Sequence, residues 1–165
     1  MNQAHWHLVV NHFPIIFPIV GIIVMISGLI IKSSAVKNTA YMIFILGSLA
    51  TVFAMKTGDE AQDMVENISG VTENYVDRHE EAAEVFAVFS YILGSISLIG
   101  FYCELKKIKL SLIYSIITLL FSIIVLFFGK QTGTTGGEIR HTEIRQNGNI
   151  NIENTEKIED DHKDD

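Results

Sequence analysis

The chain has 165 residues, of which 48% are hydrophobic, and its formal net charge is −7. This apolar content exceeds what a soluble core of such a small chain buries, so the composition predicts a membrane protein. Seven acids and two lysines in residues 146–165 contribute −5 of the charge, which leaves the rest nearly balanced. The sequence has no basic patch of the extent that would neutralise a nucleic-acid backbone, so nothing suggests nucleic-acid binding. The single cysteine, Cys103, excludes an internal disulfide.

Four apolar runs are long enough to cross a bilayer as helices, which takes about 20 residues each. They cover approximately residues 8–31, 39–56, 82–103 and 110–129. Helices that are apolar on every side have no face for water, so no soluble fold is compatible with them. The sequence therefore predicts an all-α bundle of four transmembrane helices that forms one domain over residues 1–145.

The placement of lysines predicts how this bundle lies in the membrane. The first loop contains Lys32 and Lys37 and no acid, and the third contains Lys106, Lys107 and Lys109. The connection from residue 56 to residue 84 instead holds two basic and nine acidic residues. Because short basic loops stay in the cytoplasm, we expect a multi-pass protein of a bacterial inner membrane with both termini in the periplasm. Lipid is then its first expected partner.

The third span is predicted to extend beyond the hydrocarbon. After a stop at Ser69-Gly70, Thr72 can cap a helix that continues from Glu73 into the span without a break. From Glu73 to Cys103 this helix would be about 46 Å long at roughly 1.5 Å per residue. Glycines and charged residues between 130 and 145 predict an ordered loop with a short strand or cap. The acidic tail, residues 146–165, is predicted to be disordered.

Small residues recur at helical spacing in the third span and predict a close helix contact. Such residues let helix backbones approach each other in lipid. His79 falls on the edge of this stripe, so it is expected to point into the bundle. His12 instead projects away from the Gly21 and Gly28 seam of the first span. The stripe consists of Ala83, Ala87, Ser90, Gly94 and Ser97.

All six histidines are expected on the outer side, where three segments distant in sequence would meet at one end of the bundle. We expect His12, His79 and His141 to share a site there, with His7 as a further metal ligand. His162 belongs to the acidic tail and is expected to be solvated. The full set is His5, His7, His12, His79, His141 and His162.

Two kinds of cofactor suit this set of histidines. Two facing imidazoles from different helices would hold a b-type haem. Three imidazoles with a carboxylate from Glu80, Asp59 or Glu60 would hold copper, zinc or iron instead. A third interpretation has no cofactor, because histidines in the interfacial zone often bond only to headgroups or carbonyls.

The absence of certain features also narrows the function. No span carries an ionisable residue at its middle, which argues against a pump or proton-coupled transporter. The sequence contains no nucleotide-binding loop, no serine-hydrolase elbow and no c-type haem attachment motif. We therefore assign no catalytic residue, and the chain is more readily a redox component than an enzyme.

Three stretches together resemble a known group of proteins: residues 7–14 (HLVVNHFP), residues 57–83, and residues 136–141 (GGEIRH). They are similar to uncharacterised bacterial four-helix inner-membrane proteins. That group is related to a larger domain of unknown function that opens with a His-Pro-x-x-Val-His-Phe-Pro pattern. Here Leu8 stands where that pattern has proline, and Asn11 precedes His12. Some members of the larger family look fused to c-type cytochrome modules, so the resemblance implies electron transfer.

The leading hypothesis is a membrane redox or metal-centre protein. His12 and His79 would be the axial or direct ligands, with His141 as a third ligand or a supporting partner. Asn11, Glu80 and Arg140 would orient the histidines or pair with haem propionates. The expected partner is a periplasmic electron-transfer protein or a membrane complex, and assembly of the chain into a homo-oligomer is also an open alternative. The alternative is a non-catalytic membrane subunit or scaffold without a cofactor.

Overall fold

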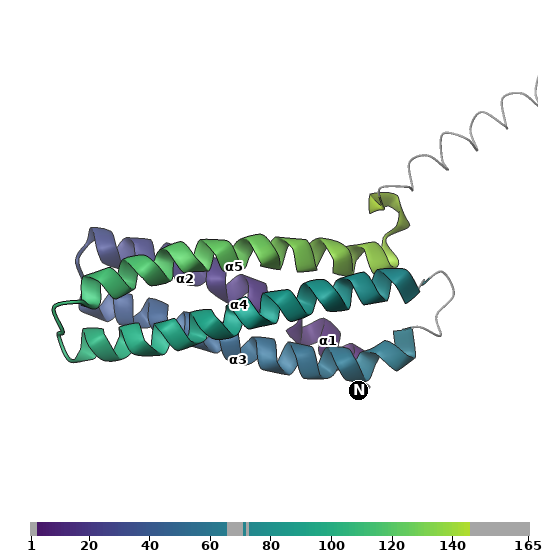
Figure 1. The fold of residues 1–165 in the computed structure, drawn as a ribbon, viewed down its shortest axis with the longest axis horizontal. Coiled ribbons are helices and arrows are strands. Elements are labelled where there is room, and N and C mark those ends of the chain that lie inside the picture. Colours follow the sequence, from purple (N-terminus) through teal and green to yellow (C-terminus); the bar gives the residue numbers. More distant parts are fainter. Residues whose placement is uncertain (1–2, 66–70, 72, 146–165) are drawn as a thin grey trace, which may run out of the picture.

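The computed structural model describes residues 3–65, 71 and 73–145 and is entirely helical over that part of the chain (Figure 1). The predicted stop at Ser69-Gly70, the cap at Thr72 and the acidic tail lie outside the described residues. The elements are α1 (Gln3–Val10), α2 (Phe13–Ile30), α3 (Ser34–Val65), α4 (Glu73–Leu105), α5 (Ser111–Arg140) and the short 3-10 helix η1 (Thr142–Ile144).

Four segments are long and apolar enough to cross a membrane: His5–Ile30, Ser34–Ala61, Glu73–Leu105 and Ser111–Arg140. The first includes both α1 and α2, which are separated by a turn at Asn11 and His12. The prediction of four spans is confirmed. So is the long third span, because α4 continues without interruption for 33 residues. At about 1.5 Å per residue this helix is about 50 Å long, well beyond a hydrocarbon core of about 30 Å.

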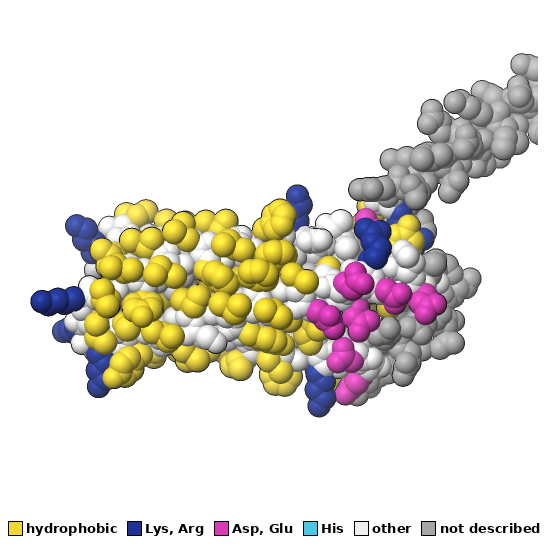
Figure 2. All heavy atoms as spheres, in the orientation of Figure 1, with side chains coloured by type: hydrophobic (Ala, Val, Ile, Leu, Met, Phe, Trp, Pro, Cys, Tyr) yellow, Lys and Arg dark blue, Asp and Glu magenta, His cyan; other side chains and the backbone are white. Residues whose placement is uncertain are grey.

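The four long helices form a closed bundle in which each contacts its neighbours in the order α2, α3, α4, α5 and back to α2. α1 packs beside α3, near the end of the bundle where α4 begins and α5 ends (Figure 1). The core contains Met25, Tyr41, Phe44, Leu93 and Val125. Hydrophobic side chains also cover the middle of the outer surface (Figure 2). A bundle that is apolar inside and outside fits a lipid environment.

The small-residue stripe of α4 lies where the sequence predicted it, in the helix contact. Ser90, Gly94 and Ser97 are all buried. A Cβ atom added to Gly94 would lie 2.6 Å from the Cβ of Ser48 on α3. The Cβ of Ser48 is held by its own backbone, so the two helices would have to separate.

Replacing Gly94 by alanine is therefore expected to lower the free energy of unfolding by about 1–3 kcal/mol through overpacking. Gly133→Ala is the matched control, because its Cβ would lie 3.6 Å from the Ile15 side chain, an ordinary contact. That control is expected to leave stability unchanged or slightly raised. Thermal unfolding in detergent, followed by circular dichroism, compares the two. Equal melting temperatures would contradict the close contact between α3 and α4.

The structure corrects the prediction for residues 130–145. We expected an ordered loop with a short strand or cap, but α5 continues as helix to Arg140 and is followed by η1. The glycines of this stretch serve close packing rather than a chain reversal. Gly136 faces His79, and Gly137 faces the side chain of Ile144. The helix ends where Arg145 donates hydrogen bonds to the carbonyls of Glu138 and Ile139, at 2.7 and 2.9 Å.

Charge is segregated along the bundle axis. Figure 2 shows lysines at one end and acidic side chains gathered near the other. Lys37 and Glu104 form a buried ion pair at the lysine-rich end, with 2.7 Å between Nζ and Oε2. Next to it the Tyr41 hydroxyl bonds to that of Ser115 at 3.0 Å. The ion pair was not foreseen from the sequence, and it joins the α2–α3 half of the bundle to the α4–α5 half.

Candidate functional site

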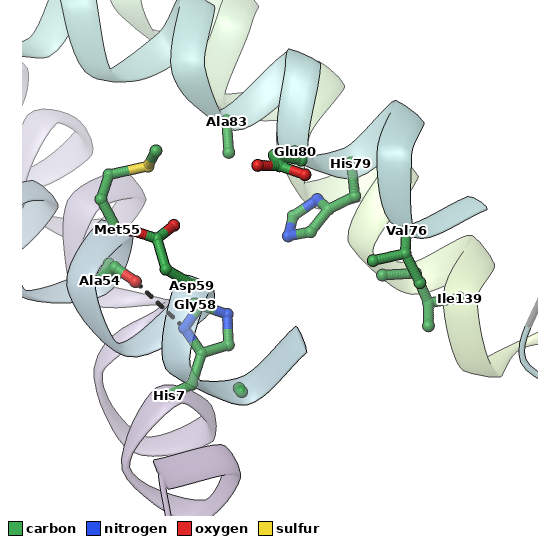
Figure 3. Close-up of a pocket in the computed structure, with 11 residues that line it drawn as sticks. His7, Ala54, Met55, Gly58, Asp59, Val76, His79, Glu80, Ala83 and Ile139 are labelled. Carbon is green, nitrogen blue, oxygen red and sulfur yellow. Dashed lines mark hydrogen bonds between the residues drawn. The ribbon is translucent and has the colours of Figure 1, made fainter. Parts of the chain in front are cut away.

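A cavity of about 110 Å³ lies at the end of the bundle opposite the lysine-rich loops (Figure 3). Its polar lining comes from three helices: His7 on α1, Asp59 on α3, and His79 with Glu80 on α4. The rest of the lining is largely apolar and includes Met55, Val76 and Ile139. Two imidazoles and two carboxylates thus face one small, mainly apolar space.

His7 is held by acceptors on α3. Its Nδ1 lies 3.2 Å from the carbonyl oxygen of Ala54 and 3.2 Å from the hydroxyl of Thr57. A carbonyl can only accept, and the Thr57 hydroxyl gives its own hydrogen to the carbonyl of Phe53 at 2.9 Å. The Nδ1 of His7 must therefore carry a proton, and in the neutral ring its Nε2 then keeps a free lone pair. A Cβ on Gly58 would lie 3.2 Å from the ring, so glycine leaves room for the imidazole.

His79 is held in the same way by α5. Its Nδ1 lies 3.2 Å from the hydroxyl of Thr135. When that hydroxyl donates its hydrogen to the carbonyl of Thr132, at 3.0 Å, its oxygen accepts from the ring. In that arrangement the neutral imidazole carries its proton on Nδ1 and leaves Nε2 free. A Cβ on Gly136 would lie only 2.9 Å from the ring, so this position requires glycine for the imidazole to fit.

The two rings occupy opposite walls of the cavity, and the second nitrogen of each is on the cavity side (Figure 3). Metal-binding histidines usually have this arrangement, in which one nitrogen donates to a carbonyl or hydroxyl and the other binds the ion. The sequence singled out His7 and His79 but not their supports. Thr57 and Thr135 were missed, because a threonine that bonds its own helix carries no distinguishing pattern in a sequence.

The structure places the other predicted site residues outside this cavity. Asn11 and His12 lie at the turn between α1 and α2, and His12 is exposed. Arg140 is also exposed, at the end of α5. Of the residues singled out from the sequence, His7, Asp59, His79 and Glu80 line the cavity. The expected meeting of His79 with His12 and His141 is therefore replaced by a meeting of His79 with His7.

His141 is engaged at the surface instead. Its Nδ1 lies 2.8 Å from a carboxylate oxygen of Glu143, and both side chains are exposed. The pKa of the Glu143 carboxyl lies below its usual range, because its own backbone amide and then the His141 ring donate hydrogen bonds to it. This exposed pair makes His141 a useful reference residue for tests of the cavity.

A test of fit separates the two cofactors predicted from the sequence. Among the side chains that the structure describes, no three from His, Cys, Asp or Glu already stand close enough to hold a metal ion. The cavity lining nevertheless includes two imidazoles, of His7 and His79, and two carboxylates, of Asp59 and Glu80. A porphyrin is a poorer fit, because pockets for ligands of that size usually measure about 300 Å³ or more.

The chain matches no protein-family model, and comparisons with curated proteins and with solved structures find no match either. The fold and the site themselves therefore define the class. The chain is a multi-pass membrane protein of four helices, with a two-histidine cavity at one end of the bundle.

Proposed function

We propose that this protein holds a transition-metal ion between His7 and His79 and uses it for electron transfer. The observation that carries the proposal is the shared orientation of the two rings. Each Nδ1 lies 3.2 Å from a hydrogen-bonding oxygen on a neighbouring helix, and both rings line the same cavity. With Nδ1 protonated in both rings, each Nε2 is left to bind the ion. Histidines that only capped the end of a bundle would not have to line one cavity together. Asp59 or Glu80 completes the ligand set.

The ligand types narrow the choice of metal. Imidazole suits iron, copper and zinc, and a carboxylate ligand is compatible with iron in particular. Zinc has no redox chemistry, so electron transfer favours iron or copper. The bound ion would exchange single electrons, while the protein fixes its ligands and keeps most of the wall apolar. Thr57 and Thr135 act as positioning residues in this scheme.

Lysine placement supports an orientation for the site. The lysine-rich loops join the ends of the helices that lie opposite the ends lining the cavity. Under the positive-inside rule those loops face the cytoplasm. The site and both termini would then face the periplasm of a bacterial inner membrane, where a soluble redox partner could reach the exposed Asp59 and Glu80.

A b-type haem is the second candidate, because two histidines from different helices are a common axial pair for it. It would require α1 to move away from α4, since the present cavity measures only about 110 Å³. A scaffold without a cofactor is the rival from another class.

One experiment distinguishes the three. The full chain is purified in detergent from cells supplied with iron, copper, zinc and haem, and its metal content and visible spectrum are measured. We expect about one equivalent of metal, lost in His7→Ala and His79→Ala but kept in His141→Ala, whose side chain lies outside the cavity. Circular dichroism checks that each variant is folded. A Soret band would favour haem. Wild-type protein that contains neither metal nor pigment would favour the scaffold without a cofactor.

A further inference from the structure

The two hairpins at the end opposite the cavity present a concentrated positive charge. We call this surface the basic end face and define it by four exposed lysines: Lys32, Lys106, Lys107 and Lys109. The one acid in these loops and the adjoining helix ends, Glu104, is already paired with Lys37. The four lysines therefore carry an uncompensated charge at one end of an apolar bundle, as the dark blue group in Figure 2 shows.

Two of these lysines have a backbone conformation that is unfavourable for residues other than glycine. Lys32 and Lys107 have φ angles of 52° and 51°, in the left-handed region. Both occupy the same place in a helix stop. The amide of Ser33 reaches the carbonyl of Gly28 at 3.0 Å, and that of Ile108 reaches Cys103 at 2.9 Å. Glycine is the favoured residue at this position of the motif, yet lysine stands there in both hairpins.

Apolar side chains alternate with these lysines. Ile31 precedes Lys32, and Ile108 and Leu110 flank Lys109; all three apolar side chains are exposed. Free inorganic phosphate has no apolar part that could contact these side chains. An anionic phospholipid matches both kinds of side chain. Its phosphate accepts hydrogen bonds from lysine ammonium groups, while its acyl chains contact the isoleucine and leucine side chains.

We propose that the basic end face binds the headgroups of anionic phospholipids and anchors this end of the bundle at the membrane surface. The charge complementarity of four lysines without a free acid commits the face to an anionic lipid rather than a zwitterionic one. This inference does not depend on the metal site.

The test uses the full chain in neutral detergent, titrated separately with dioctanoyl phosphatidylglycerol, dioctanoyl phosphatidylcholine and sodium phosphate. Native mass spectrometry measures the bound fraction. We expect selective binding of phosphatidylglycerol, weakened at least about tenfold in the Lys106→Gln/Lys109→Gln double variant. The matched control is Lys56→Gln/Lys130→Gln, which removes two exposed lysines elsewhere on the bundle and should bind as the wild type does.

A second variant separates charge from folding. Lys107→Gly removes a charge but places the favoured residue at the left-handed position, so it should melt at the wild-type temperature or above and yet bind phosphatidylglycerol more weakly. Equal binding of the two lipids by the wild type, equal competition by free phosphate, or undiminished binding in the lysine variants would each overturn the proposal.

Discussion

Replacing Lys37 by methionine is expected to lower the free energy of unfolding by about 3–5 kcal/mol, because the change strands a buried carboxylate. In the wild type the Lys37 and Glu104 side chains are only 10% and 4% exposed, and 2.7 Å separates their charged atoms. Lys37 also fills the space beside Gly28, where an added Cβ would lie 2.9 Å from its Cγ. Both charged side chains are therefore largely removed from water in the folded protein.

Equilibrium unfolding in mixed micelles, followed by circular dichroism, measures this loss. Lys32→Met is the control, because it removes an exposed lysine from the same hairpin and should change stability by less than about 1 kcal/mol. The Lys37→Met/Glu104→Met double variant removes both charges and should recover most of the loss. A double variant as unstable as Lys37→Met alone would show that lost packing, rather than the stranded charge, causes the effect.

Replacing Thr135 by valine is expected to weaken metal binding by about 10–100-fold while leaving the fold intact. Valine has nearly the shape of threonine but cannot accept the hydrogen bond from His79 Nδ1, which spans 3.2 Å. Without that acceptor the imidazole is free to carry its proton on Nε2, the nitrogen that the metal needs. The loss therefore acts through the orientation and tautomer of His79.

Two measurements check this result. Titration with cobalt(II) gives the affinity of the site, and nitrogen NMR of the metal-free protein reports which ring nitrogen of His79 carries the proton. Thr134→Val is the matched control, because its exposed hydroxyl bonds only to the carbonyl of Lys130 on its own helix. If Thr135→Val binds cobalt as tightly as Thr134→Val does, Thr135 has no positioning role.

The sequence predicted the placement of histidines at one end of the bundle better than it predicted which of them meet. Every histidine that the structure describes lies at the cavity end, as their positions at the helix termini implied. His79 was correctly expected to point inward, because it shares the small-residue stripe of α4. His12 was expected beside it, yet the turn at Asn11 and His12 packs α1 on α3 and brings His7 to the cavity instead. Pro14 has no amide hydrogen for the carbonyl of Val10, so the helix is interrupted there. Where α1 then packs is set by its contact with α3, which periodicity along one helix does not report.

The sequence by itself determined the membrane class, the four spans and the long α4, because each follows from the length and continuity of an apolar run. It also determined the segregation of charge, since lysines and acids occupy different loops. Only the tertiary structure decided that α5 extends to Arg140, that Lys37 pairs with Glu104, and that His7 faces His79. Lys37 and Glu104 are 67 positions apart in the sequence, and His7 and His79 are 72 positions apart. In lipid, helix partners are selected by shape and hydrogen bonding rather than by hydrophobicity, so the sequence alone does not reveal such pairs.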